Sequence, residues 1–243
     1  MPEAERQIFA YSGVLNPQPG QRTSAALTEY AIGLAPGDGP KRVCYLPTAT
    51  GDAQAAVDGM TARVEQITPD VTFSVLKLFT QPSVPDIRAH LMTQDVILVE
   101  GGSVVNLMAV WRAHGLPDVM RECWDAGVVL AGTSAGSMCW HLSGPTDSFG
   151  DALGPFTDGL GFLPYSNGVH DDLDDQPRRD VYRQLVAEGV LPAGYATEGG
   201  VGLHYVGTQM REAVTIRPAA RAWLVRPAAD GGYAEEAITP RAI

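Results

Sequence analysis

VVLAGTSAGSMCWH, residues 128–141, joins an apolar run to a turn built of small residues. The run at 128–131 predicts a buried strand, and residues 137–141 are compatible with a helix. A strand, a tight turn and a helix in that order form the setting in which a G-x-S-x-G sequence holds a nucleophilic serine. Ser134 is therefore a candidate nucleophile. The alternative is a glycine-rich turn that contains an incidental serine.

The residues around Ser134 suit this task. Gly132 and Gly136 leave room where a β-carbon would collide with a neighbouring strand or helix. The amides at the start of the following helix would point toward the group that the serine attacks.

The length, net charge and cysteine content of the chain exclude several classes of protein. The chain has 243 residues, a net charge of −11 and 45% hydrophobic residues. The charge argues against nucleic acid and against anionic membrane as partners. Three cysteines without a C-x-x-C pair predict neither a disulfide framework nor a zinc site. No signal peptide and no apolar run of about 20 residues is visible, so we expect a cytoplasmic protein.

Apolar strand patterns alternate with helical patterns over the first 142 residues. Strands are predicted at 7–11, 42–46, 73–78, 95–99 and 128–131, and helices at 23–34, 53–67, 84–93, 104–114 and 118–125. This alternation predicts a parallel sheet covered by helices on both faces. Ligands of such sheets bind at the carboxyl ends of the strands, where the loops 48–52, 100–103 and 132–136 should meet.

The pattern changes after residue 142. Residues 143–165 are rich in glycine, proline and aspartate and predict a long functional loop. A short strand at 166–170, a helix at 177–188 and a strand at 193–197 follow. The remaining segments, 201–206, 213–216, 221–225 and 232–238, are candidate antiparallel strands. No linker divides the chain, so residues 1–243 are expected to form a single domain.

A serine needs a base and a group that orients the base. Among five histidines, only His170 ends a strand and enters a loop, whereas His141 is predicted to lie on the helix after Ser134, pointing away. The orienting carboxylate is left open among Asp147, Glu198 and the acidic residues 151, 158 and 171–175. The amides of Gly101-Gly102-Ser103 could donate to an oxyanion together with that of Ala135.

The ordered motifs resemble one family. They are VEGGS (99–103), AVWRAHG (109–115), GTSAGS (132–137), TDSFG (146–150), GLG (159–161) and NGVH (167–170). Together they look like peptidase family S51, the group of peptidase E (α-aspartyl dipeptidase) and cyanophycinase, and the resemblance runs from about residue 43 to 207. It implies the class I glutamine amidotransferase-like fold. That fold is a three-layer, flavodoxin-like α/β structure with a mostly parallel sheet, here followed by C-terminal antiparallel strands.

The resemblance also implies roles for residues. Ser134 matches the nucleophile, with serine in place of the cysteine usual in this fold, and His170 matches the base. Asp147 and Glu198 each match an acidic residue that has been given the orienting role. Gly102 and Ala135 match the residues whose amides bind the oxyanion, and Ser103 matches the end of the loop that contains Gly102. Arg178 and Arg179 lie in the region that contacts the substrate's aspartate side chain.

This sequence departs from the family pattern at three places. The usual glycine-rich loop after the first strand is reduced to Tyr11-Ser-Gly-Val14 here. The family's G-G-G-N loop is Glu100-Gly-Gly-Ser103 here. Asp171 stands where close relatives have an aromatic residue after the histidine. A carboxylate beside the base predicts repulsion of an aspartyl substrate and a raised pKa of His170.

The sequence therefore predicts a serine peptidase that hydrolyses short peptides, Asp-X dipeptides among them, without a metal or an organic cofactor. The expected partner is a small peptide substrate, and a homodimer is compatible with the sequence. Two alternatives stay open. One is a non-catalytic binding module on the amidotransferase-like scaffold. The other is a hydrolase of a different acyl bond, such as an esterase or a cyanophycinase-like enzyme.

Overall fold

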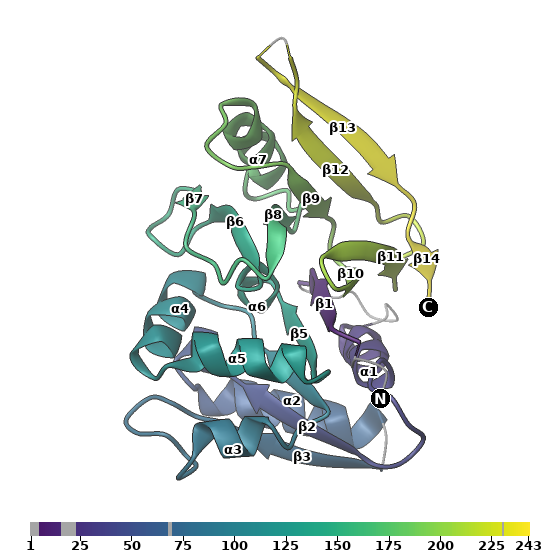
Figure 1. Ribbon diagram of the computed structural model, residues 1–243. Coiled ribbons are helices and arrows are strands. Elements are labelled where there is room, and N and C mark those ends of the chain that lie inside the picture. The colour runs from purple at the N-terminus through teal and green to yellow at the C-terminus, as the bar shows by residue number, and fades with distance from the viewer. Residues whose placement is uncertain (1–4, 16–22, 68–69, 230) are drawn as a thin grey trace.

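The larger of two sheets contains five neighbouring parallel strands. The computed structural model describes residues 5–15, 23–67, 70–229 and 231–243. Five neighbouring strands run parallel in the order β1 (Gln7–Tyr11), β5 (Val129–Thr133), β4 (Val96–Val99), β2 (Lys41–Leu46) and β3 (Val71–Val75) (Figure 1). The central strand β4 reads Val-Ile-Leu-Val, and all four side chains are buried, as expected for a strand covered on both faces. The predicted fold class is confirmed.

Helices cover both faces of this sheet. One face packs against α1 (Ala25–Gly33) and α2 (Gln54–Ile67), and the other against α3 (Ile87–Leu91), α4 (Val104–Ala113) and α5 (Leu116–Asp125). In α5 the buried side chains recur at helical spacing, namely Leu116, Met120, Cys123 and Trp124. Among the described residues, none of the helices is long and apolar enough to cross a membrane.

The antiparallel strands extend the sheet beyond β1. β10 (Val201–Val206) pairs with β1, β11 (Gln209–Thr215) pairs with β10, and the short β14 (Arg241–Ala242) pairs with β11. β1 thus lies between β5 and β10, in the middle of the sheet. Its carboxyl end therefore adjoins both the Ser134 turn and the C-terminal half of the chain.

The structure also contains a second sheet of six strands, which the sequence did not predict. Its order is β13 (Tyr233–Ile238), β12 (Ala222–Pro227), β9 (Gly194–Thr197), β8 (Leu163–Val169), β6 (His141–Thr146) and β7 (Gly154–Phe156). The helix α7 (Arg178–Ala187) packs on it (Figure 1). The predicted antiparallel strands are thus shared between two sheets.

The prediction of one long loop at 143–165 is wrong, because β6, β7 and the start of β8 lie there. Two of the glycines that suggested a loop, Gly144 and Gly159, serve close backbone approach instead. A β-carbon on Gly144 would overlap the carbonyl oxygen of Asn167 on β8, and one on Gly159 would overlap that of His141. Glycine here marks packed strands rather than irregular chain.

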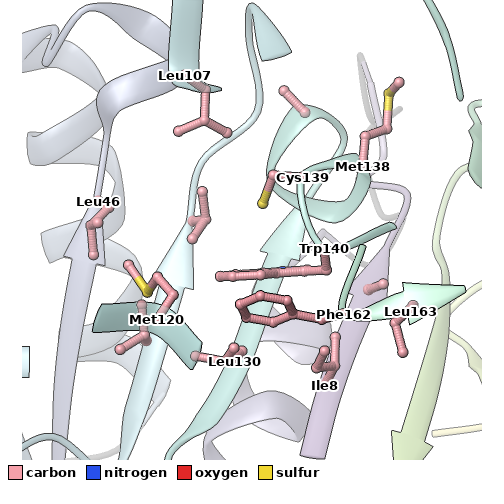
Figure 2. Close-up of a cluster of buried hydrophobic side chains, with 14 of the residues drawn as sticks. Ile8, Leu46, Leu107, Met120, Leu130, Met138, Cys139, Trp140, Phe162 and Leu163 are labelled. Atoms are coloured by element: carbon pink, nitrogen blue, oxygen red, sulfur yellow. The ribbon is translucent and has the colours of Figure 1, made fainter. Parts of the chain in front are cut away.

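The helix after Ser134 is shorter than predicted. α6 spans only Ala135–Met138, and His141 lies on β6 rather than on this helix. The chain turns at the buried Trp140, whose ring centroid lies 5.7 Å from that of Trp111 and 6.1 Å from that of Phe162. Figure 2 shows Trp140 beside Phe162. The buried aromatic contacts end α6 after one turn and direct the chain into the second sheet.

Candidate active site

Ser134 occupies a strained backbone position between β5 and α6. Its dihedrals are φ 53° and ψ −112°, a region that residues with a side chain rarely adopt. The Ser134 amide donates to the carbonyl of Tyr11 at 3.0 Å, and its carbonyl accepts the amides of Ser137 and Met138, each at 2.9 Å. The strained residue is therefore held from both sides, by β1 and by the first turn of α6.

Two glycines make this turn possible. A β-carbon on Gly132 would overlap the carbonyl of Gly136, and one on Gly136 would overlap the carbonyl of Val99 on β4. The G-x-S-x-G spacing is thus required by the close approach of α6 to β5 and β4.

The loop after β4 lies against Ser134. A β-carbon on Gly101 would lie 3.1 Å from Cβ of Ser134. Gly102 has φ 134°, and a side chain there would overlap the carbonyl of Ala49. Ser103 caps α4 by accepting the amide of Asn106 at 3.2 Å, so its hydroxyl has a structural partner.

Three amides of this region differ in their hydrogen bonds. The Gly101 amide donates to the carboxylate of Glu100 at 2.9 Å. The amides of Gly102 and Ala135 have no acceptor within the described part of the chain. These two amides are therefore the ones that remain able to bind an oxyanion next to Ser134.

His170 directly follows β8 and also has a positive φ, 58°. Its amide donates to the hydroxyl of Ser12 at 3.1 Å. Ser12 directly follows Tyr11, whose carbonyl holds the Ser134 amide. Two consecutive residues at the end of β1 therefore hold the backbones of Ser134 and His170. The sequence analysis missed Ser12, because a lone serine after a short strand carries no recognisable signal.

Burial determines the charge of the His170 ring. The side chain is nearly inaccessible, and burial lowers the pKa of His170 to about 4, with a further contribution from the charge of Arg178. The carboxylates of Asp172 and Asp147 act in the opposite direction but do not outweigh burial. The ring is thus neutral at pH 7. Its Nδ1 is buried and has no hydrogen-bond partner among the described residues.

The two predicted orienting carboxylates lie in different surroundings. Asp147 accepts hydrogen bonds from Arg178 at 2.9 Å and from Gln176 at 3.2 Å. Burial alone would raise the pKa of Asp147, but these two partners lower it below its usual value. Glu198 instead accepts the amide of Arg221 at 2.8 Å, and its charge does not contribute to the pKa shift of His170.

Asp172 is a further carboxylate near the base, and the sequence analysis did not separate it from the acidic cluster. It lines a cavity of about 260 Å³ together with His170, Gly13 and Arg217. Its two oxygens accept the Gly199 amide and the Arg217 guanidinium, both at 2.7 Å. Burial opposes ionisation of Asp172, but these contacts lower its pKa overall. Within the described residues, no group of three or more acidic, cysteine or histidine side chains could hold a metal ion.

Asp171 does not lie beside the base as predicted. Its side chain is 1% exposed and forms ion pairs with Arg183 at 2.6 Å and Arg179 at 3.0 Å. Both arginines also bind Glu235 on β13. The expectation that Asp171 raises the pKa of His170 is therefore wrong, since burial and the charge of Arg178 lower that pKa. The expected repulsion of an aspartyl substrate stays a prediction.

Arg178 and Arg179, which the sequence predicts to contact the substrate, have different ionic partners. Arg179 contacts Asp171 and Glu235 and lies 4.4 Å from the ring centroid of Trp223. Arg178 is buried, binds Asp147, and affects the pKa of His170. Its Nε is buried without a partner in the described structure. Arg178 is thus the arginine that remains close to the base.

Acid is expected to destabilise the protein through its buried histidines. His141 is fully buried, and burial lowers its pKa to about 4, as for His170. In the unfolded chain these histidines bind a proton as the pH falls below about 6.5. In the folded chain they bind it only near pH 4. The free energy of unfolding should therefore fall by about 3 kcal/mol per histidine between these values. Urea unfolding at pH 7.5, 6 and 5 measures this loss.

A matched pair of variants isolates the contribution of His141. Its Nδ1 lies 2.9 Å from the Ser137 carbonyl and its Nε2 lies 3.3 Å from the Tyr205 hydroxyl, and a glutamine amide can replace the second of these contacts. His141→Gln should flatten the dependence on pH, and His114→Gln at the end of α4 should not. An equally steep loss of stability in His141→Gln would contradict the expectation.

Comparison with known proteins shows the family of this chain. The model of peptidase family S51 matches residues 20–213. YgaJ of Bacillus subtilis (strain 168), an uncharacterized peptidase, is 38% identical over 202 residues, which are 82% of this chain and 84% of YgaJ.

Two crystal structures are also similar in fold. A peptidase from an acI-B1 Actinobacterium has a TM-score of 0.70 and 16% identity, with 98% of this chain and 96% of that one covered. A candidate peptidase E from Listeria monocytogenes EGD-e has a TM-score of 0.62 and 18% identity, with 87% and 98% covered. The family model and the relative at 38% identity together show that this chain belongs to peptidase family S51.

Proposed function

We propose that this member of peptidase family S51 is a serine peptidase that acts on short peptides, Asp-X dipeptides among them. One observation carries the proposal. Ser134 and His170 both have positive φ angles, and their backbone amides donate to Tyr11 at the end of β1 and to Ser12 directly after it. Strain of this kind persists where surrounding structure enforces it, and it is concentrated at active sites.

The proposed reaction proceeds through an acyl-enzyme. The Ser134 hydroxyl attacks the scissile carbonyl while the neutral His170 ring takes its proton. The oxyanion that forms accepts the amides of Gly102 and Ala135. His170 then gives the proton to the leaving amine as the C–N bond breaks. A water molecule, deprotonated by His170, attacks the ester, and its proton returns to Ser134 when the acid is released.

The ring and the hydroxyl are not joined by a hydrogen bond among the described residues. Catalytic hydrogen bonds are often long before substrate binds and shorten in the complex. Asp147 is the orienting carboxylate that we favour over Glu198, because the charge of Asp147 acts on the His170 ring. Asp172 supplies a second negative charge to the protonated ring.

Arg178 supports a preference for substrates that carry a carboxylate. It lies close enough to affect His170, and its Nε has no partner in the described structure. A substrate aspartate could accept this Nε hydrogen, and Asp147 would keep the arginine in place.

A dipeptide panel tests the substrate class. Asp-Leu should be hydrolysed faster than Asn-Leu and Ala-Leu by the wild type, and Ser134→Ala should hydrolyse none of them. Arg178→Lys should reduce the preference for Asp-Leu, because lysine lacks an Nε in this position. Equal rates for wild type and Ser134→Ala would refute the serine mechanism. Equal rates for Asp-Leu and Ala-Leu would refute the aspartyl preference alone.

A hydrolase of another acyl bond is the second candidate. The cavity next to His170 is also lined by Asp174 and Asp175, both exposed, so its wall carries more negative than positive charge. Such a wall favours substrates with a cationic group. An isopeptide formed between an aspartate side-chain carboxyl and an arginine amine belongs in the same panel. Faster hydrolysis of this isopeptide than of Asp-Leu would favour the second candidate.

A further inference from the structure

Glu100 is one of the two residues at which the oxyanion loop departs from the family pattern, and Ser103 is the other. It directly follows β4, and its amide donates to the Leu46 carbonyl on β2 at 3.1 Å. One carboxylate oxygen accepts the Gly101 amide at 2.9 Å, and the other accepts the hydroxyl of Tyr45. The side chain thus connects the sheet to the first peptide of the loop.

Tyr45 is a rigid anchor for this carboxylate. It lies on β2 between β4 and β3, is fully buried, and stacks on Phe73 with ring centroids 6.3 Å apart. Burial raises the pKa of Tyr45, and the charge of Glu100 raises it further, so the hydroxyl remains a donor. A hydrogen bond between a charged acceptor and a fixed donor is among the stronger kinds.

The segment that follows Glu100 needs such support. Gly101 and Gly102 are adjacent glycines, which have the largest conformational freedom of all residues. The far end of the loop is fixed where the Ser103 amide donates to the Ala49 carbonyl at 2.9 Å. Without a fixed near end, the Gly102 amide could turn away from Ser134. Because Glu100 occupies the Gly101 amide, the loop has only the Gly102 amide left for an oxyanion.

We propose that Glu100, anchored by Tyr45, is a positioning residue that holds the Gly102 amide in place for the oxyanion. This inference rests on the proposed serine mechanism. Glu100 acts through hydrogen-bond geometry and does not touch the substrate. A neutral acceptor of the same shape should therefore replace most of its effect, whereas removal of the side chain should release the loop.

The experiment compares Glu100→Ala, Glu100→Gln and Tyr45→Phe with the wild type. The readouts are kcat, KM, the rate of labelling by a fluorophosphonate and the temperature of unfolding. Glu100→Ala should lower kcat and the labelling rate by about 10- to 100-fold, because a donor to the oxyanion is no longer held. KM should change by less than about 3-fold, since the ground-state contacts of the substrate remain.

The other variants separate geometry from charge and folding. Glu100→Gln should restore most of the lost activity, and Tyr45→Phe should fall between Glu100→Gln and Glu100→Ala. The control Glu65→Ala removes an exposed carboxylate of α2 and should match the wild type. If Glu100→Ala does not fold, the same readouts are compared among Tyr45→Phe, Glu100→Gln and the wild type.

Two results would overturn the proposal. One is labelling of Tyr45→Phe or folded Glu100→Ala as fast as that of the wild type. The other is a loss in Glu100→Gln at least as large as in Glu100→Ala. Failure of the serine mechanism itself gives a different result, because the wild type would then show no labelling that depends on Ser134.

Discussion

Replacement of Ser134 by alanine or glycine is expected to lower kcat/KM by roughly 10⁴- to 10⁶-fold, the range seen when a catalytic serine is removed. The reason is that no other described hydroxyl occupies the turn between β5 and α6, beside the Gly102 and Ala135 amides. Steady-state hydrolysis of the dipeptide that the wild type hydrolyses fastest measures the loss. Wild-type rates in either variant would contradict the assignment of Ser134.

The same two variants should differ in stability. Alanine at position 134 keeps the strained dihedrals, φ 53° and ψ −112°, whereas glycine adopts them without a side-chain penalty. Ser134→Gly should therefore unfold with a free energy about 1 kcal/mol higher than Ser134→Ala, after the greater entropy of unfolded glycine is allowed for. Urea unfolding at pH 7.5 measures the difference. Equal stability would mean that the turn stores no strain.

Replacement of Arg183 by methionine is expected to have the largest effect on stability. Arg183 is 2% exposed and makes two hydrogen bonds to the Asp171 carboxylate, at 2.6 and 3.0 Å, and one to Glu235 at 2.7 Å. Removal leaves the buried Asp171 with Arg179 as its one ionic partner in the described structure. Breaking a buried ion pair in this way costs about 3 to 5 kcal/mol. Chemical unfolding of the variant measures the cost.

Two further variants identify the cause of that loss. The exposed pair Arg226–Glu236 has an N–O distance of 2.7 Å, and Arg226→Met should cost less than about 1 kcal/mol. The double variant Asp171→Leu, Arg183→Met removes both buried charges and should recover part of the stability. If the double variant were less stable than Arg183→Met, the loss of an ionic partner by the buried Asp171 carboxylate would not be the source of the effect.

The parallel half of the fold could be predicted from local sequence. The strands β1, β2, β4 and β5 contain short apolar runs, and the helices α2, α4 and α5 repeat buried apolar residues at helical spacing. The partly buried β3 is less regular and ends at Val75 rather than at the predicted residue 78. The Ser134 turn was also predictable from local sequence. Its strand, glycines and helix are consecutive in sequence, and their steric demands are local.

The second half could not be predicted in this way, because its interactions are distant in sequence. The glycines in β6 and at Gly159 look like loop residues until the strands that pack on them are known. Asp171 looked like a free charge because its partners, Arg179 and Arg183, are held toward it by Glu235, which lies far along the chain on β13. The role of Ser12 depends on β1 ending next to both Ser134 and His170, which only the sheet order reveals.

The central claim is that Ser134 is an activated nucleophile with His170 as its base. The most direct measurement is incubation of the full chain with a fluorophosphonate at pH 7.5, followed by mass spectrometry of its peptides. We predict a single adduct on the peptide that contains Ser134, absent in Ser134→Ala and formed far more slowly in His170→Ala. No adduct on the wild type, or an adduct that persists in Ser134→Ala, would contradict the account.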